Sequence, residues 1–430
     1  MSRGGGDLTP ARPAGPPAAQ APGDHGLGED LAALETDAAL SHLVEQLLDT
    51  ADVRRNHDLI RRLLAASLRF ARDDTSRLDL KIVGSALREM GDAFRMFAPF
   101  AEVPKVTLFG SARTGPSDHL YVLARDLARR LAEAGWMVVT GAGPGIMAAG
   151  NEGAGREMAI GVNIRLPFEA EPNRWIAEDE KLVEMKYFFT RKLMLMKESA
   201  GFVCLPGGFG TLDETFELLT LVQTGKAEPA PIVLVDTPGG GYWRALERFV
   251  REQVYGHGLA NERDASLYRI TDDLDEAVEE LLGFHRNYHS RRFVGDVMVL
   301  RLRHEPDPSA LAELSAEFAD LCSAKGIWRT EPLAPERSGQ DHLELARVAL
   351  EFDRVSNGRL RELIDALNRL VPAGAPVGEP PASQTGTFTG GEEAEAADDE
   401  AAQAATDARN GDGPGRRPPA PASAPGPVAP

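Results

Sequence analysis

The feature that most constrains the fold of this sequence is an apolar run that breaks into a glycine-rich turn and restarts as a helix. Residues 202–205 read as a buried strand, and the Pro-Gly-Gly-Phe-Gly sequence of residues 206–210 ends it. Thr211 is expected to cap the helix that follows, whose apolar residues recur at helical spacing. Such a turn offers N–H donors and the positive end of a helix dipole. The sequence therefore predicts a phosphate or carboxylate site here.

Short β-branched runs alternate with helical patterns on both sides of this turn. This alternation predicts an α/β fold with a doubly wound, Rossmann-like parallel sheet, whose ligands bind at the carboxyl ends of the strands. The expected strands are residues 106–109, 137–140, 160–166, 202–205 and 232–235, and the expected helices are 118–134, 145–158, 190–199, 211–223 and 242–253.

Composition shifts along the chain divide it into five expected parts. A helical N-terminal region and a small α+β appendage flank the α/β domain, and the two ends lack apolar periodicity and are expected to be disordered, the second one acidic and proline-rich. The parts are 1–28 (disordered), 29–103 (helical), 104–285 (catalytic), 286–371 (appendage) and 372–430 (disordered). In the appendage we expect strands at 294–303, 326–330 and 342–352 and helices at 308–325 and 357–370.

Charge and cysteine content limit the partners and the compartment. The 430 residues carry a formal net charge of −19, which repels a nucleic-acid backbone. Cys204 and Cys322 are the two cysteines, and neither belongs to a cluster with metal-ligand spacing. No run is long and apolar enough to span a bilayer. We therefore expect a cytoplasmic protein that binds neither nucleic acid nor membrane and needs no metal.

The motif Pro-Gly-Gly-Phe-Gly-Thr-Leu-Asp-Glu at residues 206–214 resembles the Lonely guy (LOG) family, whose members are often labelled lysine decarboxylases. The family pattern is PGGxGTxxE preceded by an Arg-Lys pair, and Arg191-Lys192 stand upstream at the spacing the family keeps. The resemblance covers residues 104–283. It implies a phosphoribohydrolase, which hydrolyses the N-glycosidic bond of a nucleoside 5′-monophosphate to the free base and ribose 5-phosphate.

By this resemblance Arg191 and Glu214 are the catalytic residues. Glycosidic cleavage develops positive charge on the ribosyl carbon, which a carboxylate such as Glu214 stabilises, and the Arg191 guanidinium stays charged at any working pH. Taken singly, Glu214 could be a first-turn acid favoured by the helix dipole, and Arg191-Lys192 a solvated face. The combined motif favours catalysis.

The resemblance also implies a set of substrate-binding residues, with the glycines of the turn holding the 5′-phosphate. At Thr220 a core-facing threonine is an almost equal alternative. The chain has Phe188-Phe189 where many members have Met-His, which leaves the preferred base open. The expected substrate-binding residues are Ser111, Gly143, Glu169, Lys192, Gly207, Gly208, Gly210, Thr211 and Thr220.

The cofactor and partner expectations follow from these residues and from the resemblance. Residues 141–145 invite a dinucleotide-binding reading, but they lack the final glycine of G-x-G-x-x-G, and no lysine context for decarboxylation is evident. We expect no cofactor, a small nucleotide substrate and at least a homodimer. The substrate could be AMP in purine salvage or an N6-modified cytokinin nucleotide. A non-catalytic nucleotide-sensing module is the alternative function, although retention of both Arg191 and Glu214 favours turnover.

Overall fold

A computed structural model describes residues 38–165 and 171–372 of the chain. The described residues belong to two compact units, one that ends at Gly84 and one that begins at Ser85. Each unit has its own hydrophobic core, so the two are described separately.

The first unit consists of α2 (Ala38–Thr50), α3 (His57–Arg72) and the beginning of α4 (Arg77–Phe97). Val44 and Leu48 of α2 and Ala65 of α3 form its small core. Both helices carry apolar residues on one side, and much of that side is exposed, including Leu43 and Leu47 of α2 and Leu59 and Leu63 of α3.

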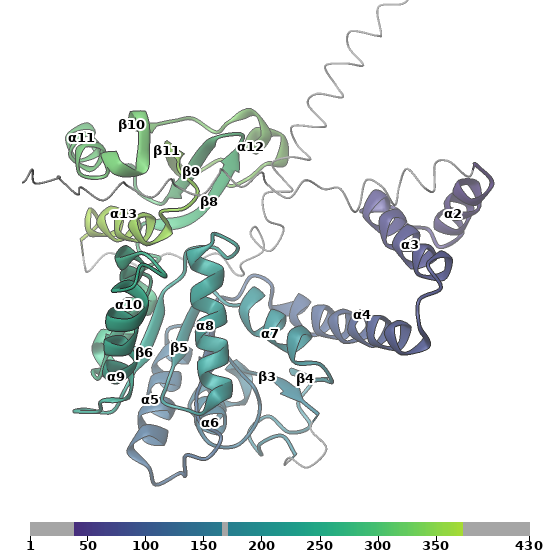
Figure 1. Ribbon diagram of the computed structural model, residues 1–430, viewed down its shortest axis with the longest axis horizontal. Coiled ribbons are helices and arrows are strands. Elements are labelled where there is room, and N and C mark those ends of the chain that lie inside the picture. The colour runs from purple at the N-terminus through teal and green to yellow at the C-terminus, as the bar shows by residue number, and fades with distance from the viewer. Residues whose placement is uncertain (1–37, 166–170, 373–430) are drawn as a thin grey trace, which may run out of the picture. The chain divides into compact units, whose positions relative to one another are not determined.

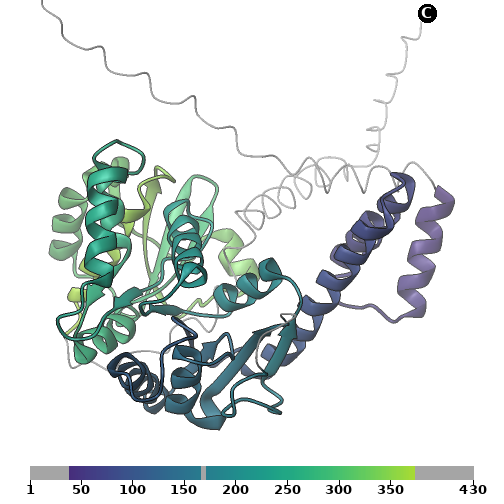
Figure 2. The same ribbon diagram turned by 60° about the horizontal axis from the view of Figure 1, so that its bottom comes forward.

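The second unit is built on a seven-stranded sheet in which every neighbouring pair is parallel. The strand order is β4-β3-β2-β1-β5-β6-β7, so the chain winds outward from β1 in one direction and returns to add β5 on its other side. Helices cover both faces of this sheet (Figures 1 and 2). The expected doubly wound α/β fold is confirmed.

The bounds of the elements show which helices and strands the sequence-based prediction left out. The strands β4 and β7 and the helix α10 were not predicted. The strands are β1 (Lys105–Phe109), β2 (Met137–Thr140), β3 (Ala159–Ile164), β4 (Leu182–Met185), β5 (Gly201–Cys204), β6 (Ile232–Val235) and β7 (Arg269–Thr271). The helices are α5 (His119–Glu133), α6 (Ile146–Met158), α7 (Phe188–Lys197), α8 (Phe209–Gln223), α9 (Tyr242–Phe249) and α10 (Leu274–Gly283), with the shorter η1 (Ala98–Phe100), η2 (Val250–Tyr255) and η3 (Glu262–Leu267).

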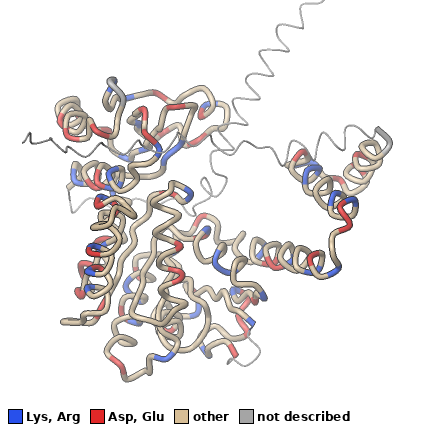
Figure 3. Tube along the Cα trace, in the orientation of Figure 1, with Lys and Arg blue, Asp and Glu red and all other residues tan. Residues whose placement is uncertain are grey.

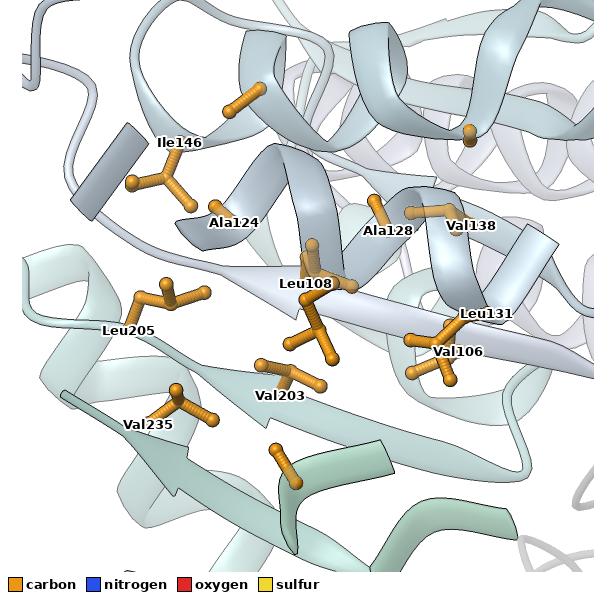
Figure 4. Close-up of a cluster of buried hydrophobic side chains, with 14 of the residues drawn as sticks. Val106, Leu108, Ala124, Ala128, Leu131, Val138, Ile146, Val203, Leu205 and Val235 are labelled. Carbon is orange, nitrogen blue, oxygen red and sulfur yellow. The ribbon is translucent and has the colours of Figure 1, made fainter. Parts of the chain in front are cut away.

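Two apolar clusters hold the layers together, one on each face of the sheet. The first joins β1, β2, β5 and β6 to α5, α6 and α10, and Figure 4 shows Leu108 and Val203 of the strands facing Ala124, Ala128 and other side chains of this cluster. The second cluster joins the opposite face to α7, α8, α9 and the end of α4. Strands that are buried on both faces read as continuous apolar runs, which is why they could be predicted.

The C-terminal part of the second unit is an antiparallel sheet of order β10-β11-β9-β8 with helices. Four expectations for it are wrong in detail. Residues 294–303 are not one strand, because a hairpin turn at Gly295 separates β8 from β9; the helix expected at 308–325 ends at Glu317; β10 starts earlier than residue 326; and β11 starts later than residue 342. The elements are β8 (Tyr288–Val294), β9 (Val297–Leu302), α11 (Pro308–Glu317), η4 (Ala319–Leu321), β10 (Cys322–Arg329), α12 (Ala334–Gly339), β11 (Ala346–Phe352) and α13 (Asn357–Arg369).

This small domain lies against the end of α8 that is remote from the glycine turn (Figure 1). The Asn357 side chain donates to the Gln223 carbonyl at 2.9 Å, and the Arg291 guanidinium donates to the carbonyls of Gly225 and Ala227. Arg291 also forms an ion pair with Glu228 at 3.2 Å. These contacts attach the appendage to the α8–β6 loop.

Candidate active site

The glycine-rich turn connects the central strand β5 to α8. The Ser111 N–H, from the loop after β1, donates to the Pro206 carbonyl at 3.2 Å, so the two neighbouring strand ends are tied together. A Cβ on Gly207 would lie 2.2 Å from the Thr211 hydroxyl oxygen and 3.0 Å from the Ser111 nitrogen. Position 207 therefore requires glycine because the turn packs directly on its own helix.

The expected cap at Thr211 is wrong. The N-cap of α8 is Gly208, and the helix begins at Phe209. Thr211 lies in the first turn with a buried side chain beneath Gly207. Gly208 has the extended backbone typical of an N-cap, with φ −88°, and it makes no side-chain cap hydrogen bond.

A second loop, at residues 141–145 after β2, packs against the loop after β1, where the Ile146 N–H donates to the Ser111 carbonyl at 2.9 Å. Ala142 has φ +60°, a conformation that non-glycine residues rarely adopt. Four hydrogen bonds hold this part of the loop. The Ala142 N–H donates to the Thr140 hydroxyl, the Asn173 side-chain amide donates to the Ala142 and Gly143 carbonyls, and the Asn173 backbone N–H also donates to the Ala142 carbonyl. Asn173 could not be predicted from the sequence as part of the site, because it contacts a loop some thirty residues earlier.

Arg191 reaches from α7 to a carbonyl of β3 and to one of the loop after β2. Its Nε donates to the Val162 carbonyl at 3.0 Å and its Nη2 to the Gly141 carbonyl at 3.3 Å. A Cβ on Gly141 would lie 1.9 Å from Nη2, so this glycine leaves room for the guanidinium. The side chain is 11% exposed. Arg191 is thus held in one orientation by backbone carbonyls.

Glu214, one turn into α8, lies beside this guanidinium. Its Oε1 is 4.0 Å from Arg191 Nη1, and its side chain is 12% exposed. Burial raises the pKa of Glu214 from 4.5 to about 7, while Arg191 and Lys192 act in the opposite direction and Asp213 and Glu217 raise it further. The structure therefore brings together the two residues expected to be catalytic, with a carboxyl that titrates near neutral pH.

Lys192 lies between two acids of α8. Its Nζ is 2.7 Å from Asp213 Oδ2 and 2.6 Å from Glu217 Oε2, and these partners raise its pKa against the effect of burial. Figure 3 marks acidic positions along α8 and basic positions on the neighbouring α7. Lys192 thus joins the two helices that carry Arg191 and Glu214.

The carboxylate of Glu89, on α4, bonds to the beginning of α7. Glu89 Oε2 accepts from the Thr190 hydroxyl at 2.9 Å and from the Tyr187 N–H at 3.3 Å. Tyr187 is the N-cap residue of α7, and its side chain makes no cap hydrogen bond. Glu89 thus places a carboxylate from elsewhere in the chain at the start of α7, which the sequence did not indicate.

The other predicted residues are placed as follows. The Ser111 hydroxyl accepts from the Arg113 N–H at 3.0 Å. Gly143 faces the side chain of Met147, and nothing lies within 4 Å of a Cβ built on Gly208. Thr220 is exposed and its hydroxyl donates to the Phe216 carbonyl, so the alternative of a core-facing threonine is wrong. Glu169 lies outside the described residues.

The phenylalanines at the start of α7 and α8 are exposed, whereas the cysteine that precedes the glycine turn is buried. Phe209 at the start of α8 is 93% exposed, and Phe188 and Phe189 at the start of α7 are each more than half exposed. Cys204, directly before the turn, is fully buried, and burial raises the pKa of its thiol to about 12. Cys204 therefore packs as a small apolar core residue with a protonated thiol.

Within residues 38–165 and 171–372, no group of three or more His, Cys, Asp or Glu side chains could hold a metal ion. Among the helices that the structure describes, none combines the length and the apolar character needed to cross a membrane.

Comparison with known structures finds two molybdenum cofactor proteins, each matched over 41% of this chain. A molybdenum cofactor carrier protein from Chlamydomonas reinhardtii is 19% identical with a TM-score of 0.28, covering 41% of this chain and 94% of that one. A molybdenum cofactor binding protein from Rippkaea orientalis is 17% identical with a TM-score of 0.29, again covering 41% and 94%.

Comparison with known sequences finds a family model and named relatives. Residues 144–281 match the family model described as possible lysine decarboxylase. A probable cytokinin riboside 5′-monophosphate phosphoribohydrolase from Oryza sativa is 29% identical over 156 residues, covering 35% of this chain and 61% of that protein. One of the same description from Arabidopsis thaliana is 30% identical over 155 residues, covering 35% and 73%. The chain thus spans less than two thirds of the rice relative and almost three quarters of the Arabidopsis one. On this identity and coverage, together with the motif at residues 206–214, the chain belongs to the Lonely guy family.

Proposed function

We propose that this protein hydrolyses the N-glycosidic bond of nucleoside 5′-monophosphates, AMP or N6-modified cytokinin nucleotides, to the free base and ribose 5-phosphate. The observation that carries the proposal is the buried pair of Arg191 and Glu214, 4.0 Å apart, next to the glycine turn. The relatives named as phosphoribohydrolases support the same reaction.

The reaction breaks the bond between the ribosyl carbon and the base nitrogen, and the electron pair leaves with the base. Positive charge develops on the ribosyl carbon and ring oxygen, where the ionised Glu214 stabilises it and orients the attacking water. The water oxygen bonds to the ribosyl carbon. Its proton passes to the carboxylate and then to the departing base, so atoms and charge balance.

Arg191 and the glycine turn have separate roles in this proposal. The guanidinium cannot serve as an acid at working pH, so it stabilises charge on the phosphate or the departing base through fixed hydrogen bonds. The N–H groups of Gly208 and of the first turn of α8 hold the 5′-phosphate. Binding energy from the phosphate then positions the scissile bond, which makes nucleotides better substrates than nucleosides.

The test is to incubate the purified, metal-stripped protein with AMP, GMP, CMP, N6-isopentenyl AMP and adenosine. Free base and ribose 5-phosphate are followed by chromatography. Release from monophosphates and not from adenosine is expected, and the relative rates identify the preferred base. If a nucleotide raises the melting temperature but no base is released from any compound, the protein is a nucleotide sensor and the proposal is wrong.

The rate should depend on pH through Glu214. The mechanism needs the ionised carboxylate, and burial raises its pKa to about 7, so kcat/KM is expected to rise about tenfold per pH unit below 7 and to level off above it. Because the Lys192 charge lowers this pKa, Lys192→Met should move the midpoint to higher pH. A wild-type profile that is flat from pH 5.5 to 8 would contradict this role for Glu214.

We further propose that the protein is at least a homodimer, formed through an exposed apolar stripe on α4. The stripe consists of Leu80, Val83, Leu87 and Phe94, all exposed, with Gly84 and Gly91 between them. At 100° per residue these six positions fall within a sector of about 100°. Nothing lies within 4 Å of a Cβ built on either glycine.

The glycines favour a second copy of α4 as the occupant of this stripe. A glycine inside a helix costs about 1 kcal/mol relative to alanine, and no contact within the described chain requires these two. Their spacing of seven residues, alongside Leu80, Leu87 and Phe94 at the same interval, suits close approach of a second helix with the same repeat.

Placing a charge on the stripe should separate the subunits. Leu87→Glu removes apolar burial and adds a carboxylate, so dimer affinity should fall at least about 100-fold and light scattering should report the mass of one chain. Arg88→Glu, at the adjacent exposed position outside the stripe, should keep the dimer. A monomeric wild type, or a Leu87→Glu protein that stays dimeric, would show that the stripe is not an interface.

We also propose that the protein is cytoplasmic, because both Cys204 and Cys322 are free thiols, as suits a reducing compartment.

A further inference from the structure

Tyr242 is a residue that the sequence did not single out and that contacts the glycine turn from α9. Its hydroxyl donates to the Gly207 carbonyl at 2.8 Å. The residue lies 35 positions beyond Gly207, on the first turn of a different helix, so the contact is a product of the fold.

The Tyr242 ring is held firmly in place. Its backbone N–H donates to Asp236 Oδ2 at 2.9 Å, and Asp236 itself is buried. The ring packs edge-on against Trp243, with centroids 4.8 Å apart, and the Trp243 indole donates to the Val235 carbonyl. The hydroxyl is therefore presented to the turn by a rigid support at the end of β6.

This contact fixes the direction of a whole peptide group. The Gly207 carbonyl and the Gly208 N–H belong to the same planar trans peptide, so they point in opposite directions. With the carbonyl bound by Tyr242, the Gly208 N–H must point to the other side of the turn. Gly207 and Gly208 both lack a side chain, so without this contact the peptide could rotate at small cost.

A second contact fixes the preceding peptide in the same way. The Pro206 carbonyl accepts from the Ser111 N–H, so the Gly207 N–H is directed away from the β1 loop. Two successive peptide groups of the turn are thus oriented by partners from other loops. Gly208 is also the N-cap of α8, where N–H groups lack partners within the helix.

We propose that Tyr242 is a positioning residue for the phosphate site: its hydroxyl holds the Gly207–Gly208 peptide in the orientation that presents the Gly208 N–H to a phosphomonoester. This inference rests on the proposed function of the glycine turn. It assigns no bond-making step to Tyr242, which acts through the peptide that it holds.

The test is Tyr242→Phe, which keeps the ring and removes the hydroxyl. Affinity for ribose 5-phosphate, measured by calorimetry, should fall about fivefold, because one fixed donor to a charged group is lost. KM for AMP should rise by a similar factor with kcat nearly unchanged, since the remaining N–H donors of the turn still hold the bound phosphate and position the scissile bond. If the Tyr242 hydroxyl served only to stabilise the fold, the variant would lose kcat and thermal stability as well.

Tyr255→Phe is the matched control, because it also removes one partly buried hydroxyl, one that bonds to Tyr268. It should leave ribose 5-phosphate binding unchanged. If Tyr242→Phe binds ribose 5-phosphate as tightly as wild type, Tyr242 does not position the turn and the inference is overturned while the proposed function stands. If the wild type binds neither ribose 5-phosphate nor inorganic phosphate, the phosphate role of the turn fails, and this inference fails with it.

Discussion

Glu214→Gln is expected to lower kcat about 1,000-fold while making the folded protein more stable above neutral pH. The loss of turnover follows because a neutral amide cannot stabilise the positive charge that develops on the ribosyl carbon or accept a proton from water. Nucleotide binding should persist, since the phosphate and the base are held by other groups.

The gain in stability follows from the buried carboxyl. Its folded pKa of about 7 lies above the ordinary 4.5, so the folded state binds the proton more tightly than the unfolded state does. The ionised carboxylate therefore reduces the free energy of unfolding, fully above pH 7 and progressively less as the pH falls toward 4.5. Removing it should add about 1–3 kcal/mol at pH 8, a gain that already allows for the attraction to Arg191, and almost nothing at pH 4.5.

Chemical denaturation at pH 8 and pH 4.5, together with single-turnover rates, measures both effects. Glu217→Gln is the control: it lies three residues further along α8, and its carboxylate contacts Lys192. This control should retain turnover within a few-fold. Unchanged turnover in Glu214→Gln would remove Glu214 from the mechanism, and a loss of stability at pH 8 would mean that the residue is structural.

The α/β core could be predicted because its signals are local. Strands such as β5 and β6 are buried on both faces and read as apolar runs, and each is followed by a helix with its own periodicity. In the appendage, β8 contains His289, Arg291 and Arg292, which hide the strand. Arg291 is buried there because it bonds to carbonyls more than sixty residues earlier, and a sequence does not display such partners.

Helical periodicity misled the prediction at residues 308–325. Leu311, Leu314, Phe318 and Leu321 recur at spacings of three and four, and all are buried. Yet α11 ends at Glu317, and the chain forms η4 before β10 begins at Cys322. The apolar residues face one core in either conformation, so periodicity alone did not locate the end of the helix.

In the candidate site, the motif identified the residues proposed to bind or cleave the substrate. It did not identify the residues that hold those side chains and loops in place. Arg191 and Glu214 could be named from spacing and resemblance. Glu89, Asn173 and Tyr242 could not, because each contacts the site from a separate element across a large separation in sequence. Thr211 was assigned as a cap because threonine is a favoured N-cap residue, whereas glycine fills that position here.

Arg191→Lys is expected to lower kcat/KM about 100-fold or more, although the positive charge is kept. The guanidinium bonds to the Val162 and Gly141 carbonyls with two separate nitrogens while a third faces Glu214, and an ammonium on a flexible chain cannot reproduce this geometry. Arg191→Met should lose more activity, because the charge disappears as well. It should also cost about 1–3 kcal/mol of stability if the buried Val162 carbonyl is left without a donor.

The pH dependence separates the two variants. Arg191 is the first among the charges that lower the pKa of Glu214, so the methionine variant should move the midpoint of kcat/KM above 7, whereas lysine should leave it closer to the wild-type value. Arg165→Lys, at an exposed arginine paired with Glu184, is the control and should change neither rate nor midpoint. If Arg191→Lys turns over at the wild-type rate, the charge alone suffices. The contacts of Arg191 with the Val162 and Gly141 carbonyls would then stabilise the fold and not the reaction, because an ammonium group that lacks the fixed geometry of the guanidinium would support the same rate.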